Sequence, residues 1–141
     1  MRPAAARYDL PVMTAVHDPL PPALVRHVAR YVEAVNSGDT GAVHGLYAGP
    51  GVVVPRPGFP LAGADRRAAT EYVAGLGVPM RAALRHAYVV DGVALLVVDW
   101  SIRGTARDGT AVDMHGTAAD VVRREPDGTW RYLVDNPYGT A

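Results

Sequence analysis

Two side chains in the second half of the chain are of the types that general acid–base chemistry needs. They are Asp135, in the segment LVDNPYG, and His115, in the segment DMHGT. Desolvation at the end of an apolar strand raises the pKa of a carboxyl group, and an imidazole titrates near neutrality, so either group could move a proton. A structural interpretation stays open for both. Asp135 could accept a hydrogen bond from Arg131 or cap the turn before Pro137, and His115 could be an ordinary half-exposed strand residue.

Tyr31 and Trp100 are candidates for holding a substrate. Tyr31 lies in the middle of an expected helix, on its apolar stripe, so its hydroxyl needs a buried partner. In a dry cavity that hydroxyl could stabilise negative charge on a substrate oxygen; alternatively, Tyr31 is a core residue bonded to Tyr72 or to the backbone. Trp100 suits the wall of an apolar pocket and an ordinary core equally well.

The sequence gives no support to several other kinds of site. The absence of cysteine excludes disulfides, thiolate metal ligands and a cysteine nucleophile. No spacing of His, Asp and Glu fits a metal site, and no Gly-x-Gly-x-x-Gly, P-loop or Gly-x-Ser-x-Gly motif occurs. The formal net charge of +0, with no basic run, argues against nucleic acid as a partner. We therefore expect no cofactor, no metal and no nucleic acid.

The elements that must position these residues divide into a helical half and a sheet half. Helices are expected from Pro22 to about Asn36, after Asp39, and from about Asp65, with a short strand at 52–55 between the last two. The second half has the alternation and turn signals of four antiparallel strands, at 80–90, 93–104, 110–124 and 129–137. This order predicts an α+β fold with three N-terminal helices packed on a curved, mainly antiparallel sheet.

The turns also predict which strand residues share a face of the sheet. A two-residue turn at Asp91-Gly92 sets Val90 opposite Val93, and similar pairing across Asp108-Gly109 extends the alternation to the later strands. A slip of one residue would exchange the faces and make Asp99 the pocket acid. The predicted cavity face holds Arg85, Val98, Trp100, Ile102, His115, Thr117, Leu133 and Asp135, and the opposite face holds His86, Tyr88, Val97, Asp99, Asp120, Tyr132 and Asn136.

Three segments of the chain resemble a known superfamily. ARYVEAVNSGDTGAVHGLYAGPGVVV is similar to the opening of ketosteroid isomerases and of the SnoaL-like polyketide cyclases, and EYVAGLG to the end of their third helix. DVVRREPDGTWRYLVDNPYG is similar to the last hairpin of SnoaL-like proteins. Over residues 22–139 the chain thus resembles the nuclear-transport-factor-2-like (NTF2-like) superfamily, which implies a cone-shaped fold. Enzymes, binding modules and scaffolds share that fold, so the resemblance leaves the activity open.

The resemblance also implies roles for individual residues. The tyrosine that donates to the substrate oxyanion in ketosteroid isomerases falls on Tyr31, and the two tyrosines that support it fall on Tyr47 and Tyr72. The carboxylate base of those enzymes falls on Pro55, in VVVPRPGF, and their second oxyanion donor falls on Thr117. Proline cannot accept a proton, so the steroid-isomerase mechanism is unavailable in its usual form.

Two functions are compatible with these residues, beside a third option, a dimerisation module with no ligand. The first is a cofactor-free isomerase, cyclase or dehydratase acting on an apolar carbonyl compound such as a polyketide or terpenoid, with Tyr31 as donor and Asp135 or His115 moving the proton. The second is a non-catalytic protein that binds a small molecule, which Pro55 favours. Whether the protein is an enzyme is therefore open. Trp100, Thr117, Leu133, Pro55 and the two supporting tyrosines Tyr47 and Tyr72 would form the rest of the binding pocket.

The remaining expectations concern organisation and surroundings. Residues 1–19 are expected to form a flexible arm and residues 20–141 a single domain. No apolar run approaches the length of a membrane span, and the first residues lack the apolar region of a signal peptide, so a cytoplasmic location without membrane contact is expected. In the superfamily the outer sheet face commonly pairs with a second subunit, which implies a homodimer.

Overall fold

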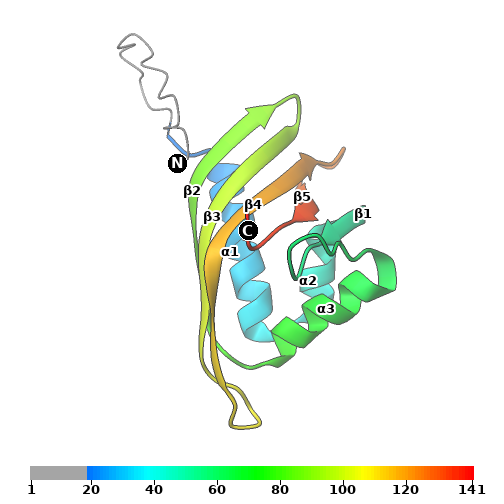
Figure 1. The fold of residues 1–141 in the computed structure, drawn as a ribbon. Helices are drawn as coiled ribbons and strands as arrows, with labels where there is room; N and C mark the ends of the chain where they lie inside the picture. Colours follow the sequence, from blue (N-terminus) through cyan, green and yellow to red (C-terminus); the bar gives the residue numbers. More distant parts are fainter. Residues whose placement is uncertain (1–18) are drawn as a thin grey trace, which may run out of the picture.

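The computed structural model describes residues 19–141 (Figure 1). The arm predicted for residues 1–19 lies outside the described residues, apart from Pro19. Three helices and one strand come first, and four further strands follow, so the predicted α+β order is confirmed.

Local signals explain where the helices begin and end. Helix α1 (Pro22–Ser37) has proline in its first turn and ends at Gly38, whose φ of 69° is left-handed. Helix α2 (Thr40–Gly45) is capped by Asp39, whose side chain accepts a hydrogen bond from the N–H of Ala42. Helix α3 (Gly63–Gly75) begins two residues before the predicted start.

The five strands form one sheet in the order β1-β5-β4-β3-β2. Strands β2 (Met80–Val90), β3 (Val93–Thr105), β4 (Ala111–Arg124) and β5 (Trp130–Asp135) are the predicted antiparallel meander. Strand β1 (Tyr47–Val53) begins earlier than the predicted residue 52 and pairs with β5 in parallel, with a shift in register between Tyr47 and Val52.

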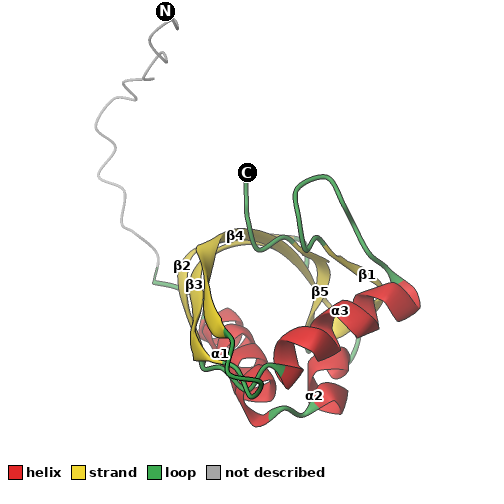
Figure 2. Cartoon of the chain, turned by 60° about the horizontal axis from the view of Figure 1, so that its bottom comes forward, coloured by secondary structure: helices red, strands yellow, loops and turns green. Residues whose placement is uncertain are grey.

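The sheet curves around one side of the molecule and the helices close the other (Figure 2). This arrangement follows from the alternation of the strands, since residues buried on the inner face of the sheet meet the apolar stripe of α1. The fully buried side chains that join the two layers are Leu24, Val43, Leu96 and Val122.

The loop between β3 and β4 does not have the predicted two-residue form. Ala106 and Thr110 still pair, because the N–H of Ala106 donates to the carbonyl of Thr110, so three residues form the turn. Gly109, at φ 86°, supplies the left-handed residue that a three-residue turn requires. Thr117 consequently lies opposite Asp99, and the predicted faces of β4 are exchanged.

Two bulges change the predicted faces elsewhere. In β2 the pairing shifts between Leu84 and His86, so Arg85 is an extra residue and points to the outer face, where it pairs with Asp99. In the β4–β5 pairing, the partner of Val122 is Tyr132 and that of Val121 is Val134. The residue between these two partners, Leu133, has no partner on β4.

No helix in residues 19–141 is both long enough and apolar enough to cross a membrane.

Candidate functional site

A cavity of about 330 Å³ lies between the inner face of the sheet and the helices α1 and α3. Most of its walls are aliphatic or aromatic, and its polar groups come from α1, α3, β4 and β5. A largely apolar hollow with few polar groups is the usual form of a small-molecule site. The polar and phenolic residues that line it are Tyr31, Thr70, Tyr72, Asp120, Tyr132, Asp135 and Tyr138.

Asp135 is a buried carboxylate with tyrosine donors. The Tyr47 hydroxyl donates to its Oδ2 at 2.5 Å, and Tyr31 lines the same cavity. Burial raises the pKa of Asp135 to about 6, while the neighbouring hydroxyl groups of Tyr47 and Tyr31 oppose that increase. A carboxylate with this pKa is ionised at neutral pH and is basic enough to accept a proton from carbon.

A second carboxyl group, that of Asp120, opens into the same cavity from β4. It is 4% exposed, and its Oδ1 accepts the backbone N–H of Asn136 at 2.8 Å. Burial, followed by the negative charge of Asp135, raises its pKa well above the usual range. The two carboxyl groups are therefore driven toward different protonation states, with Asp120 neutral while Asp135 is charged.

Three tyrosines surround this pair. The rings of Tyr31 and Tyr47 lie 6.5 Å apart, and Tyr132 lies 5.4 Å from Tyr31 and 5.2 Å from Tyr47. Burial and the nearby carboxylates raise the pKa of all three phenols, so each keeps its proton and remains a donor. Behind Tyr132, burial lowers the pKa of His27 to about 4, which leaves that imidazole neutral.

Trp100 forms an apolar wall and does not offer its N–H to a ligand. Its Nε1 donates to the carbonyl of Pro137 at 2.6 Å, and Tyr138 packs edge-on against its ring. The ring lies against Gly116 on β4, where a Cβ would approach Nε1 to 3.3 Å. These contacts hold Pro137 and Tyr138, which follow β5, against the cavity that they line.

Pro55 and Tyr72 line the cavity close to solvent. Pro55 is exposed and follows β1, at the position where the resemblance implied the usual base. Tyr72 is 70% exposed and is therefore not a buried support for Tyr31, which corrects that expectation. Tyr132 takes the place in the aromatic cluster that the resemblance had implied for Tyr72.

Of the residues predicted from the sequence, five line the cavity and one lies behind it. Those on the cavity are Tyr31, Tyr72, Trp100, Asp135 and Pro55, and Tyr47 lies behind Asp135. Three predicted positions are wrong. Thr117 faces outward and donates to Asp99 at 2.8 Å, and His115 is exposed beside Asp113, because the three-residue turn exchanges the faces of β4. Leu133 is the bulge residue and does not line the cavity.

Sequence reasoning missed Asp120 and Tyr132 as cavity residues. A signal for Asp120 was present, because the residues Met114, Gly116, Ala118 and Asp120 alternate with His115, Thr117 and Ala119 of the outer face. Reading Arg107-Asp108-Gly109 as a three-residue turn would have selected that set. No comparable signal marks the bulge that brings both Tyr132 and Asp135 to the inner face.

The side chains present do not suggest a metal site. Within residues 19–141 no group of three or more His, Asp or Glu side chains is arranged to hold an ion.

Comparisons with known proteins agree on the fold. No protein-family model and no curated protein sequence matches the chain. A conserved protein from Planctomyces limnophilus is 23% identical, with a TM-score of 0.72 over 80% of this chain and 90% of the other. A candidate dehydratase of the NTF2-like family from Streptomyces avermitilis is 19% identical, with a TM-score of 0.65 over 80% and 90%.

An NTF2-like superfamily protein from Salmonella enterica is 18% identical, with a TM-score of 0.63 over 84% of this chain and 91% of the other. At these identities the likeness concerns the fold and not the activity. Together with the helix order, the strand order and the cavity between sheet and helices, it shows that the chain has the NTF2-like fold.

Proposed function

We propose that this protein catalyses proton transfer at a carbon atom beside the carbonyl group of an apolar small molecule. The reaction would be an isomerisation, a cyclisation or a dehydration that needs no cofactor. The observation that supports this proposal is the meeting of two buried carboxyl groups, Asp120 and Asp135, in one apolar cavity. Such pairs, whose environments separate their protonation states, are typical of acid–base sites.

Each carboxyl group has its own role in the proposed reaction. Ionised Asp135 takes a proton from the carbon beside the carbonyl, and the electron pair of that C–H bond moves onto the carbonyl oxygen. Neutral Asp120 and the Tyr31 hydroxyl donate hydrogen bonds to this oxygen while it carries negative charge. Asp135, now protonated, returns its proton to another carbon in an isomerisation, or to a departing hydroxyl group in a dehydration.

The cavity walls favour a neutral substrate. No arginine lines the cavity among the described residues, and the ionised carboxylate of Asp135 would repel an anion. The aliphatic walls and the Trp100 ring suit a flat apolar body, and its one polar end would lie against Asp120, Asp135 and Tyr31. A compact polyketide or terpenoid ketone, or the corresponding β-hydroxy ketone, has this chemistry. Loss of water from a β-hydroxy ketone would be a dehydration, and one of the similar structures, from Streptomyces avermitilis, is named as a candidate dehydratase.

The non-catalytic alternative has one observation in its favour, which is Pro55 at the position of the usual base. On that hypothesis the cavity binds the same class of ligand without turnover. A protein that binds the ligand but does not accelerate proton exchange at carbon would support this alternative.

Binding of a flat phenol tests whether the polar end of the cavity recognises an enolate-like group. We expect 2-naphthol to bind to the wild-type protein and about five- to tenfold more weakly to Tyr31→Phe, since a neutral hydrogen bond contributes roughly 1 kcal/mol. Isothermal titration calorimetry gives both affinities. His115→Ala is the control, because His115 lies on the outer face, and its affinity should equal that of wild type. Equal binding by wild type and Tyr31→Phe would exclude Tyr31 from the site.

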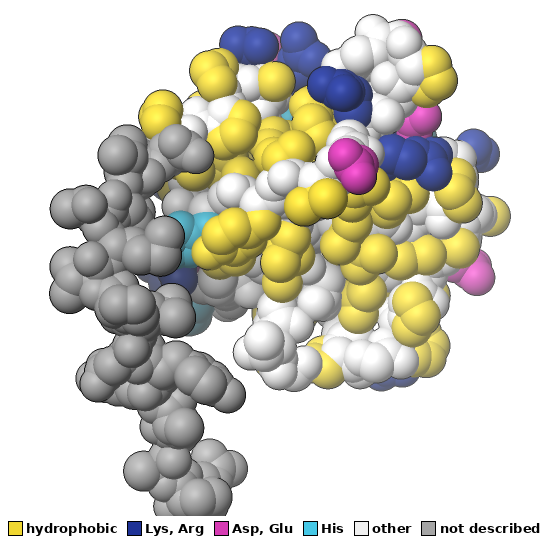
Figure 3. All heavy atoms as spheres, turned by 90° about the horizontal axis from the view of Figure 1, so that it is seen from above, with side chains coloured by type: hydrophobic (Ala, Val, Ile, Leu, Met, Phe, Trp, Pro, Cys, Tyr) yellow, Lys and Arg dark blue, Asp and Glu magenta, His cyan; other side chains and the backbone are white. Residues whose placement is uncertain are grey.

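We also propose that the outer face of the sheet forms a homodimer. It exposes Tyr88, Val90, Val93 and Leu95, and the polar set Arg85, Asp99 and Thr117 lies beside them. Figure 3, which looks at the molecule from above, shows hydrophobic side chains over much of that end of the molecule, with arginines and a few acidic side chains among them. Exposed apolar side chains gathered on one surface are typical of protein–protein interfaces.

Sedimentation of a charged variant tests this interface. We expect wild type to sediment as a dimer and Leu95→Glu as a monomer, because a carboxylate would be buried without a partner. Val25→Glu on α1 is the matched control, since Val25 is 43% exposed and Leu95 41%. A Leu95→Glu protein that remains dimeric would show that this face is not the interface.

A further inference from the structure

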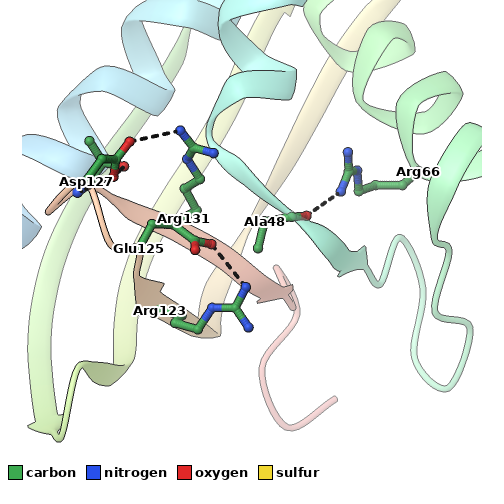
Figure 4. Close-up of polar contacts among 7 residues, drawn as sticks. Ala48, Arg66, Arg123, Glu125, Asp127 and Arg131 are labelled. Atoms are coloured by element: carbon green, nitrogen blue, oxygen red, sulfur yellow. Dashed lines mark hydrogen bonds and ion pairs between the residues drawn. The ribbon is translucent and has the colours of Figure 1, made fainter.

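Arg66 on α3 is a buried cation close to the candidate site. Its side chain is 4% exposed, and one guanidinium nitrogen, NH1, donates to the carbonyl oxygens of Ala48 and Gly51, both at 3.1 Å. Figure 4 shows this side chain reaching from α3 to Ala48 on β1. These two carbonyls lie in the stretch where the pairing of β1 with β5 shifts register. Arg66 thus supplies a donor to two backbone carbonyls in the irregular part of this strand.

The same guanidinium lies over the ring of Tyr47. Its central carbon is 4.7 Å from the ring centroid, which is a cation–π contact. The hydroxyl of that ring donates to Oδ2 of Asp135 at 2.5 Å. A cation on the face of a phenol withdraws electron density from it, and a phenol with less electron density is a stronger hydrogen-bond donor.

Two further observations separate this arginine from the others in Figure 4. Arg123 and Arg131 pair with Glu125 and Asp127 in partly exposed ion pairs. Arg66 forms no ion pair within residues 19–141, and its Nε has no hydrogen-bond partner. Burying an unpaired charge is costly, so the contacts that Arg66 does make are the ones that must offset that cost. One of them is the aromatic ring that touches Asp135.

We propose that Arg66 is a positioning residue of the site, which fixes Tyr47 from behind and strengthens the hydrogen bond by which Tyr47 keeps Asp135 ionised. This inference rests on the proposed role of Asp135 as the base. Arg66 does not line the cavity and acts on the substrate only through Tyr47 and Asp135.

The test measures the ionisation of Asp135 itself. Carbon-13 NMR of its carboxyl carbon between pH 4 and pH 9 gives the pH midpoint at which Asp135 loses its proton. Arg66→Met removes the charge and both hydrogen bonds, and Arg66→Gln removes the charge but keeps an N–H donor. We expect both variants to raise the Asp135 midpoint by about one pH unit, a roughly tenfold gain in proton affinity. Arg66→Lys, which keeps the charge, should restore most of the wild-type midpoint.

Tyr47→Phe shows whether the effect passes through Tyr47. This variant should raise the Asp135 midpoint by itself, and adding Arg66→Gln to it should change the midpoint little further. An unchanged midpoint in Tyr47→Phe would overturn the proposal even if the neutral variants at Arg66 fail to fold. Arg66 variants that melt earlier but titrate like wild type would overturn it too, and would leave a purely structural role. None of these results depends on turnover, so failure of the proposed function remains a separate outcome.

Discussion

Asp135→Asn is expected to lower the rate of proton exchange at carbon by about 10²–10⁴-fold, the usual contribution of a general base. The amide keeps the shape of the carboxylate and can still accept a hydrogen bond from the Tyr47 hydroxyl, but it cannot accept a proton from carbon. The rate is measured as deuterium uptake from D2O beside the carbonyl of 2-tetralone, an apolar ketone that reports proton abstraction without knowledge of the natural substrate.

The pH dependence of wild type strengthens this test. Because burial raises the pKa of Asp135 to about 6, the rate of uptake should rise with pH through that value and then level off. Asp135→Asn should lose this rise together with the rate. Asp120→Asn keeps an N–H donor at the position of the neutral acid, so a smaller loss is expected there.

Binding separates loss of the base from loss of the site. Asp135→Asn should still bind 2-naphthol, since the cavity walls and Tyr31 are unchanged. Deuterium uptake equal in wild type and Asp135→Asn would exclude Asp135 as the base. No uptake above the uncatalysed rate in wild type, with binding intact, would favour the non-catalytic alternative.

The fold was predictable because its signals are local. Pro22, Gly38 and Asp39 mark helix ends through their own backbone preferences and capping groups, and the structure has helix ends at all three. Asp91-Gly92 specifies a two-residue turn, and Val90 pairs with Val93 as that turn requires. None of these inferences needs a residue more than a few positions away.

The site was only partly predictable because the face of each strand residue depends on counting through every turn and bulge. One additional residue in the turn at Gly109 moves Asp120 inward and His115 and Thr117 outward. The prediction that Asp135 faces the cavity is correct, but simple alternation does not explain it. The bulge at Leu133 brings both Tyr132 and Asp135 to the inner face. Irregular strand pairing also involves contacts distant in sequence, such as those of Arg66 with Ala48 and Gly51 beside the register shift of β1, which alternation does not reveal.

The buried carboxyl pair should also make the protein less stable as pH rises. Both carboxyl groups have a raised pKa in the folded state, so the folded protein binds these protons more tightly than the unfolded chain does. The stabilisation is fully present below the unfolded pKa near 4 and is lost as pH rises through each folded pKa. For Asp135 the loss between pH 5 and pH 6 is about 1 kcal/mol, and Asp120 extends the loss to higher pH.

Asp120→Asn is therefore expected to be more stable than wild type at pH 8 and to have a smaller decline in the free energy of unfolding between pH 5 and pH 8. Asparagine keeps an oxygen for the N–H of Asn136 and is neutral without a bound proton, so its contribution to folding does not fall as pH rises. Urea unfolding at several pH values measures both quantities. Asp99→Asn is the control: Arg85 holds the pKa of Asp99 below its usual range, so that exposed residue stays ionised throughout and should leave the decline unchanged. If the free energy of unfolding of Asp120→Asn declines as steeply with pH as that of wild type, Asp120 is already ionised in the folded protein. Asp120 would then be a second base and not the neutral acid that the proposed reaction requires.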